Sequence, residues 1–200
     1  ARADLSPVIG SEEAARDVRL LLGRATGWSA AQVSVAGTEV LSDVLLGTLQ
    51  AMLARRMQRE PLAQILGQWA FYGRKFRVTR DTLTPRPDTE TLVDLALAAP
   101  FSRVLDLGTG TGAIAVSLLA ERAGATGVAS DISPAALGVA AENARRHAVA
   151  GRLDLVQADW WDGIVGRFDL IVSNPPYVTE AEYARLAPEI RTGRRSPADP

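Results

Sequence analysis

Short apolar segments that alternate with helical patterns dominate the second half of this chain. The pattern predicts strands at residues 103–107, 126–130, 153–157 and 168–173, and helices at about 112–122 and 134–147. Such alternation is typical of an α/β fold, in which helices pack on a parallel sheet. Ligands of open α/β sheets bind in the crevice outside the carboxyl ends of the strands. The residues that follow each predicted strand are therefore the first candidates for a functional site.

The first third of the chain is helical in pattern. Residues 11–24, 29–34 and 42–59 show helical spacing of apolar residues, and Ser11, Ser29 and Ser42 are the expected N-caps. Aromatic and β-branched residues around Gly73 predict a β-hairpin over about 69–80, and Pro87 lies near the start of a further helix that runs to about residue 99. We expect three parts: a small helical-bundle domain at 1–67, a β-hairpin linker at 68–85 and the α/β domain at 86–200.

Composition argues against several classes of function. The chain has 200 residues, a net charge of −1, no cysteine and one histidine. Thiolate metal sites and disulfides are excluded, and neither a His-rich metal site nor a Ser-His-Asp triad is expected. The near-neutral charge argues against a protein whose main task is to grip a nucleic-acid backbone. With no apolar run of about 20 residues and no signal-peptide pattern, we expect a cytoplasmic protein without a bound metal.

The first predicted strand runs into a glycine-rich loop, "DLGTGTGAIA", that opens a helix. Gly108, Gly110 and Gly112 allow a sharp turn and a close approach of a ligand to the main chain, although a plain strand-to-helix turn also uses glycines. The spacing is not the G-x-G-x-x-G of nicotinamide dinucleotide sites, and Asp106 would repel a pyrophosphate but attract an ammonium group. Asp131, about 20 residues beyond the loop, can accept from both hydroxyls of a ribose. The combination fits S-adenosylmethionine.

The segment "QADWWDG" follows the third predicted strand. Asp159 is placed to accept from the amino group of an adenine, and Trp160 to pack on its ring. Both tryptophans are also compatible with a buried core. We expect the side chain of Trp160 to contact the ligand and that of Trp161 to lie in the core.

The fourth predicted strand ends in "SNPPYV". Two prolines cannot continue a ladder of backbone hydrogen bonds, so the segment is at least a strand stop and a turn. It also suits methyl transfer to a planar amino or amide nitrogen. Asn174 Oδ1 and the carbonyl of Pro175 can accept both N–H bonds of that nitrogen, which directs its lone pair toward the methyl donor. The prolines stiffen the loop, and Tyr177 can stack on the flat target group.

These motifs together resemble the S-adenosylmethionine-dependent amino methyltransferases. The upstream segments "EPLAQILG" and "FRVTRDTLTPRPDTETLVD" narrow the resemblance to the protein-(glutamine-N5) methyltransferases called HemK or PrmC, which modify peptide-chain release factors in translation termination. The resemblance covers about residues 11–190. A PRP-[DE]-T-E segment joined to NPPY is a specific signal, whereas either motif alone is not.

The resemblance implies a Rossmann-like methyltransferase sheet with strand order 3-2-1-4, and a helical N-terminal domain that grips the release factor together with the catalytic domain. The glutamine of the factor's Gly-Gly-Gln loop would be the substrate. The resemblance implies that Gly108, Thr109, Gly110, Thr111, Gly112, Asp131, Trp160 and Asn174 bind the cofactor, and the residue arguments above add Asp106 and Asp159. The implied substrate-binding residues are Asn174, Pro175, Pro176 and Tyr177, of which Asn174, Pro175 and Tyr177 are the catalytic ones.

Two alternatives remain open at this point. The NPPY motif also serves N6-adenine and N2-guanine nucleic-acid methyltransferases, because exocyclic amines pose the same chemical problem as amides. A fragment that binds the cofactor without catalysis is the other alternative.

The family pattern continues into three further strands, whereas this sequence ends in "TGRRSPADP" after "APEIR". We therefore expect a sheet truncated after its fourth strand, with that strand as an apolar edge, and a chain that self-associates and binds cofactor weakly.

Overall fold

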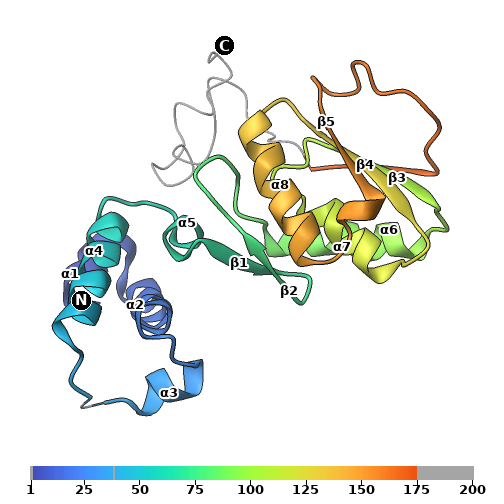
Figure 1. Ribbon diagram of the computed structural model, residues 1–200. Helices are drawn as coiled ribbons and strands as arrows, with labels where there is room; N and C mark the ends of the chain where they lie inside the picture. Colours follow the sequence, from blue (N-terminus) through green and yellow to red (C-terminus); the bar gives the residue numbers. More distant parts are fainter. Residues whose placement is uncertain (1, 38, 175–200) are drawn as a thin grey trace. The chain divides into compact units, whose positions relative to one another are not determined.

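The computed structural model describes residues 2–37 and 39–174, and Figure 1 shows the arrangement of the helices and strands. The described residues divide into two compact units, one up to Leu66 and the other from Gly67 onward. No helix in this part of the chain is long and apolar enough to cross a membrane.

Five helices make up the described part of the first unit. They are α1 (Arg2–Ile9), α2 (Ser11–Thr26), α3 (Ala30–Val35), α4 (Asp43–Met57) and α5 (Leu62–Leu66). The expected caps Ser29 and Ser42 are confirmed, since each side chain accepts a hydrogen bond from a backbone N–H of the first turn. The expectation for Ser11 was wrong, because Gly10 precedes the helix and Ser11 is its first residue. Helices α1 and α5 were not expected.

A buried ion pair joins α2 to α4 in the first unit. Arg56 Nε donates to Asp17 Oδ2 at 2.7 Å, and Arg56 Nη2 donates to Glu13 Oε1 at 2.9 Å. Arg56 is 4% exposed and Asp17 is 2% exposed, so both charges are removed from water. A third guanidinium nitrogen donates to the carbonyl of Glu60 at 3.2 Å. The guanidinium is therefore satisfied by partners on three sides, as a buried cation requires.

The second unit holds the β-hairpin and the parallel sheet, and the sequence predicted both of these elements. Its elements are β1 (Gln68–Phe71), β2 (Arg74–Arg77), the 3₁₀ turn η1 (Pro87–Thr89), α6 (Glu90–Ala98), β3 (Arg103–Leu107), α7 (Ala113–Glu121), β4 (Thr126–Asp131), α8 (Pro134–Arg146), η2 (Ala150–Arg152), β5 (Leu153–Gln157) and β6 (Leu170–Ser173). The strand order is β5-β4-β3-β6 and every pair is parallel, which confirms the α/β fold and the 3-2-1-4 order.

The two faces of this sheet are covered to different extents within the described residues. One face packs against the hairpin and helices α6, α7 and α8 through a large apolar cluster that includes Phe71, Phe76 and Val104. The other face carries a small cluster of Leu105, Leu107 and Val128, against which Val156, Ile164 and Phe168 are packed. On this second face, Ile171 of the edge strand β6 is paired with Leu105 and is 61% exposed.

The large apolar cluster on one face of the sheet determines where the loops leave the strands. Since helices α7 and α8 directly follow β3 and β4, their packing on one face fixes where each loop leaves the sheet. All four strands are parallel, so the glycine-rich loop, Asp131, the 158–160 segment and Asn174 leave from the same edge. This edge is the candidate site.

Candidate functional site at the carboxyl edge of the sheet

The glycine-rich loop has a backbone that only glycine adopts easily. Gly108, Gly110 and Gly112 have φ values of 68°, 54° and 77°. A Cβ built on Gly108 or Gly110 would meet no atom within 4 Å among the described residues, so the space beside the main chain is open there. A Cβ on Gly112 would lie 3.1 Å from Ala140 Cβ, so this glycine also permits the close packing of α7 on α8. The first two glycines leave room for a ligand, whereas the third serves the fold.

The loop is fastened to the end of the neighbouring strand β4. The backbone N–H of Thr109 donates to the carbonyl of Ser130 at 2.8 Å, and the N–H of Gly110 donates to Asp131 Oδ2 at 2.8 Å. Asp131 Oδ1 accepts from the N–H of Ser133 at 2.9 Å. The carboxylate of Asp131 therefore holds the loop in place and remains partly exposed. The N–H of Gly110 is already bonded to Asp131.

Asp106 lies beneath this loop and is fully buried. Its Oδ2 accepts from the hydroxyl of Thr109 at 2.7 Å and from the N–H of Ala115 at 3.3 Å. Its Oδ1 is buried without a hydrogen-bond partner among the described residues. Burial raises the pKa of Asp106 from 3.8 to about 7, and the nearby charge of Asp131 adds to the rise. The hydrogen bonds from Thr109 and Ala115 lower the pKa and only partly offset burial.

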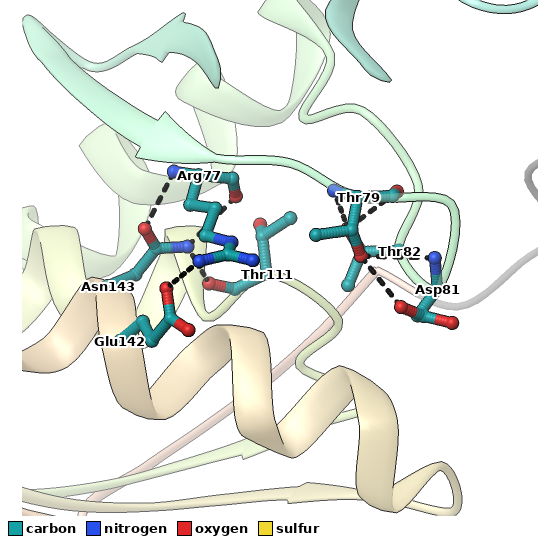
Figure 2. Close-up of polar contacts among 7 residues, drawn as sticks. All are labelled: Arg77, Thr79, Asp81, Thr82, Thr111, Glu142 and Asn143. Carbon is teal, nitrogen blue, oxygen red and sulfur yellow. Dashed lines mark hydrogen bonds and ion pairs between the residues drawn. The ribbon is translucent and has the colours of Figure 1, made fainter. Parts of the chain in front are cut away.

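A buried amide supports the loop from behind (Figure 2). Asn143 on α8 is 0% exposed, and its Nδ2 donates to the carbonyl of Thr111 at 2.8 Å and to the carbonyl of Arg77 at 3.1 Å. Its Oδ1 accepts from the N–H of Arg77 at 2.7 Å. Beside it, the guanidinium of Arg77 forms an ion pair with Glu142. One side chain thus connects strand β2, helix α8 and the glycine-rich loop.

Figure 2 also shows the turn that continues from the hairpin toward η1. The hydroxyl of Thr79 donates to Asp81 Oδ2 at 3.0 Å and accepts from the N–H of Asp81 at 3.1 Å. Thr82 is 2% exposed, and its hydroxyl donates to the carbonyl of Thr79 at 3.4 Å. This turn fixes the course of the chain that leads to Thr89.

The segment after β5 lies against the end of β4. The N–H of Ala158 donates to the carbonyl of Asp131 at 3.2 Å, and the hydroxyl of Ser130 donates to the carbonyl of Trp160 at 3.1 Å. Trp160 has a φ of 53° and is 51% exposed, and Asp159 is exposed. The core interpretation of Trp161 was wrong, because its side chain is 66% exposed. The two indole rings are 6.4 Å apart between centroids.

Asn174 directly follows β6 and its side chain is held by a residue far away in the sequence. Its Nδ2 donates to the hydroxyl of Thr89 at 2.8 Å. Ser173 is paired with Leu107, and its hydroxyl donates to the Leu107 carbonyl at 2.9 Å. Asn174 and Gly108 are the next residues of these two paired strands, so the amide and the glycine-rich loop start side by side. Pro175, Pro176 and Tyr177 lie outside the described residues.

The family models and the curated relatives that match this chain point to one family. The "Methyltransferase small domain" model matches residues 87–191, more than half of the chain, and the "PrmC N-terminal domain" model matches residues 3–67. The release factor glutamine methyltransferase of Cereibacter sphaeroides is 54% identical over 182 residues, which cover 91% of this chain and 66% of that protein. The chain belongs to the release factor glutamine methyltransferase (PrmC) family.

Other members of the PrmC family match over a similar range. The release factor glutamine methyltransferase of Rhodospirillum rubrum is 45% identical over 186 residues, or 92% of this chain and 57% of that protein. The one of Escherichia coli is 40% identical over 185 residues, or 90% of this chain and 66% of that protein. The chain thus spans about two thirds or less of the length of these relatives. Membership of the family, inferred from the sequence, is confirmed.

Sequence reasoning missed two residues of this PrmC-family site. Asn143 interrupts the apolar face that Ala136, Val139, Ala140 and Ala144 form on α8, and a polar residue at such a position was a signal of a buried hydrogen-bonded amide. Thr89 lies in the PRP-D-T-E segment, which indicated the family but suggested no role for the hydroxyl. Among the described residues, no cluster of His, Cys, Asp and Glu could hold a metal ion.

Proposed function

We propose that the protein containing this chain transfers a methyl group from S-adenosylmethionine to the side-chain nitrogen of the glutamine in the Gly-Gly-Gln loop of a peptide-chain release factor. The observation that carries the proposal is the adjacency of Gly108 and Asn174, which follow the paired residues Leu107 and Ser173. A loop suited to the methyl donor and an amide suited to the acceptor nitrogen therefore start from neighbouring strands.

The residues of the edge fit S-adenosylmethionine. Open space beside Gly108 and Gly110 accommodates a ligand against the main chain, and the partly exposed Asp131 has acceptor capacity left for ribose hydroxyls. The unpaired Oδ1 of Asp106 lies beneath the loop, and the carboxyl group favours an ammonium group there when it is ionised. We assign the exposed Asp159 and the half-exposed Trp160, which follow β5 at the same edge, to the adenine. When bound, the cofactor supplies a methyl group on a positively charged sulfur.

The chain's own task is to hold and orient the acceptor nitrogen. An amide nitrogen is a poor nucleophile because its lone pair is delocalised into the adjacent carbonyl. Asn174 Oδ1 and the carbonyl of Pro175 accept its two N–H bonds and favour a pyramidal nitrogen. Preorganised acceptors of this kind stabilise the charge that develops during the reaction. Tyr177 stacks on the flat amide of the substrate. No dedicated general base is needed, because a methylated amide nitrogen with an extra proton is a strong acid.

The charge and the N-terminal unit favour a protein substrate over a nucleic acid. The chain carries a net charge of −1, and a protein that grips a nucleic-acid backbone needs an excess of Lys and Arg. We assign the helices of residues 2–66, which match the PrmC N-terminal domain, to recognition of the release factor. The names of the relatives support this substrate class.

The test uses isotopically labelled S-adenosylmethionine and three candidate acceptors: a release factor, the same factor with the Gly-Gly-Gln glutamine replaced by alanine, and a duplex oligonucleotide. We expect mass spectrometry to find one added methyl group on the glutamine of the unmodified factor alone. Methylation of the oligonucleotide, or of the factor that lacks this glutamine, would overturn the proposed substrate. Tight cofactor binding without any transfer would favour the non-catalytic alternative.

A further inference from the structure

The hydrogen bond between Thr89 and Asn174 joins two segments that are 85 residues apart in the sequence. Thr89 is 8% exposed, whereas Asn174 is exposed. A buried hydroxyl therefore holds the Nδ2 end of an exposed amide, at 2.8 Å. That bond engages the nitrogen of the amide and not its Oδ1.

Hydrogen bonds and apolar packing hold the segment that carries Thr89 in place. The N–H of Thr89 donates to the carbonyl of Arg86 at 3.0 Å, which closes the turn η1. The next residue, Glu90, accepts from the N–H of Tyr72 at 2.8 Å through its Oε1 and so ties the start of α6 to the hairpin. Val93 and Ala96 of the same helix are buried in the large apolar cluster. The hydroxyl of Thr89 is thus fixed in space by the core.

The side-chain amide of an asparagine has two orientations of nearly equal shape. Either its oxygen or its nitrogen can face the acceptor nitrogen of the substrate. Only one of them suits an acceptor nitrogen that offers two N–H bonds, because two donors cannot pair. The nitrogen end of Asn174 donates to the Thr89 hydroxyl, and this orientation leaves the oxygen end for the substrate. Because a hydroxyl can also donate, Thr89 holds the amide in place, and the two N–H bonds of the substrate select this orientation.

We propose that Thr89 is a positioning residue for methyl transfer, which holds the Asn174 amide with Oδ1 turned toward the acceptor nitrogen. The proposal rests on the proposed function of Asn174. It assigns a chemical role to the threonine of the PRP-D-T-E segment and explains why that segment and the NPPY motif belong to one site. Thr89 acts through Asn174 and needs no contact with the substrate or the cofactor.

The test compares two substitutions of Thr89, each measured beside the wild-type protein. Thr89→Val keeps the shape of the side chain and removes the hydroxyl, whereas Thr89→Ser keeps the hydroxyl. We expect Thr89→Val to lower kcat about tenfold, the usual effect of one lost hydrogen bond, with the Kd for S-adenosylmethionine and the melting temperature little changed. Thr89→Ser should restore kcat to within about threefold of the wild type. Asp88→Ala is the matched control, because Asp88 is exposed and pairs with Arg86.

The outcomes separate this proposal from the function on which it rests. If the wild-type protein methylates the release factor and Thr89→Val does so with an unchanged kcat, the positioning role is overturned. If Thr89→Ser is as slow as Thr89→Val, the hydroxyl is not the responsible group and the proposal fails as well. A wild-type protein that methylates no release factor would instead overturn the proposed function. Nuclear magnetic resonance of the Asn174 side-chain amide gives a second readout, since Thr89→Val should shift it and Thr89→Ser should not.

Discussion

Asn143 Nδ2 lies 2.8 Å from the carbonyl oxygen of Thr111, so a fully buried amide on α8 holds the glycine-rich loop from behind. The same amide exchanges two hydrogen bonds with the backbone of Arg77 on β2. The hairpin and the candidate cofactor loop therefore share one anchor. A disturbance at this anchor should reach the loop without any change to the loop's own sequence.

Replacement of Asn143 by alanine should reduce both stability and cofactor affinity. Three backbone groups lose their partner, namely the buried carbonyl of Thr111 and the partly buried N–H and carbonyl of Arg77, and an unsatisfied buried group costs about 1–3 kcal/mol. We expect chemical denaturation to show a loss of at least that size and calorimetry to show weaker binding of S-adenosylmethionine. Glu142→Ala is the control, since Glu142 is the preceding residue on α8 and pairs with the partly exposed Arg77 side chain. Equal losses for both variants would contradict the anchoring role.

Replacement of Asn174 by alanine should abolish most methyl transfer while the fold is retained. One of the two preorganised acceptors on the target nitrogen is lost, which typically costs about 10²–10³ in rate. Single-turnover kinetics with labelled cofactor and release factor measure the loss, and circular dichroism checks the fold. Asn174→Asp should also be slow, because it brings a negative charge next to the loop. Near-normal turnover by Asn174→Ala would remove this residue from the catalytic assignment.

Replacement of Asp131 by alanine should weaken binding of S-adenosylmethionine, with the affinity for the release factor largely unchanged. Two charge-assisted bonds to the ribose would be lost, each worth roughly 1.5–3 kcal/mol. The carboxylate also accepts from the N–H groups of Gly110 and Ser133, so the glycine-rich loop loses a hydrogen bond that holds it to the end of β4. Asp131→Asn keeps one acceptor oxygen and should show a smaller loss. Calorimetry that finds the same cofactor affinity in both variants as in the wild type would contradict the ribose role.

Much of the second unit could be predicted because its signals are local. Apolar runs of strand length, helical spacing and turn residues set the elements, and parallel strands put the chain reversals at one edge. The bounds of β3 and β5 agree with the expected ones, whereas β6 begins at Leu170, after Phe168 has packed on the second face of the sheet. Motif residues such as Gly108 and Asp131 could be found because the loop and the strand end carry them in sequence.

Contacts between distant segments could not be predicted from the same signals. Thr89 and Asn174 are 85 residues apart, and Asn143 and Arg77 are 66 residues apart, so no spacing rule brings them together. Arg56 and Asp17 fall on the same helix faces as the apolar residues. Only the fold shows that the two charges compensate each other in an ion pair. The 66% exposure of Trp161 was missed for a related reason, since an aromatic residue gives no sign of whether its strand end is covered.

The ionisation of Asp106 should make cofactor affinity depend on pH. Burial raises its pKa to about 7, so the carboxyl is largely neutral at pH 6 and becomes charged above pH 7. A charged carboxylate beneath the loop attracts an ammonium group. We therefore expect the affinity for S-adenosylmethionine to increase between pH 6 and about 7.5, where an α-amino group of pKa about 7.7–8.0 is still mostly protonated. Asp106→Asn should bind more weakly at pH 7.5 and show little dependence on pH.

The same pKa has a consequence of opposite sign for stability in the absence of ligand. Asp106 has a higher pKa in the folded chain than its ordinary value of 3.8, so its contribution is greatest below about pH 4. As the pH rises from there through about 7, the folded state must either keep a proton that the unfolded state releases or bury a charge. We expect the Asp106 contribution to the free energy of unfolding to fall over this range. Urea denaturation of the wild type and of Asp106→Asn would measure it, and identical pH profiles would contradict the assignment.

Two neighbouring arginines of α4 provide a test of the buried ion pair in the first unit. Arg56 is enclosed and bonded to Asp17, whereas the exposed Arg55 pairs with Glu60 across 2.7 Å on the surface. Removal of one partner of a buried pair costs about 3–5 kcal/mol, because the other charge is left without compensation. We expect a loss of that size for Arg56→Met and of about 0–1 kcal/mol for Arg55→Met.

The double variant Arg56→Met with Asp17→Leu then shows what the ion pair itself contributes. It removes both charges at once, and apolar side chains of similar volume often replace a buried pair without loss. We expect it to recover most of the stability that Arg56→Met loses, in urea denaturation of the protein. A double variant that is as unstable as the sum of Arg56→Met and Asp17→Leu would show that the two residues stabilise the helices independently rather than as a pair.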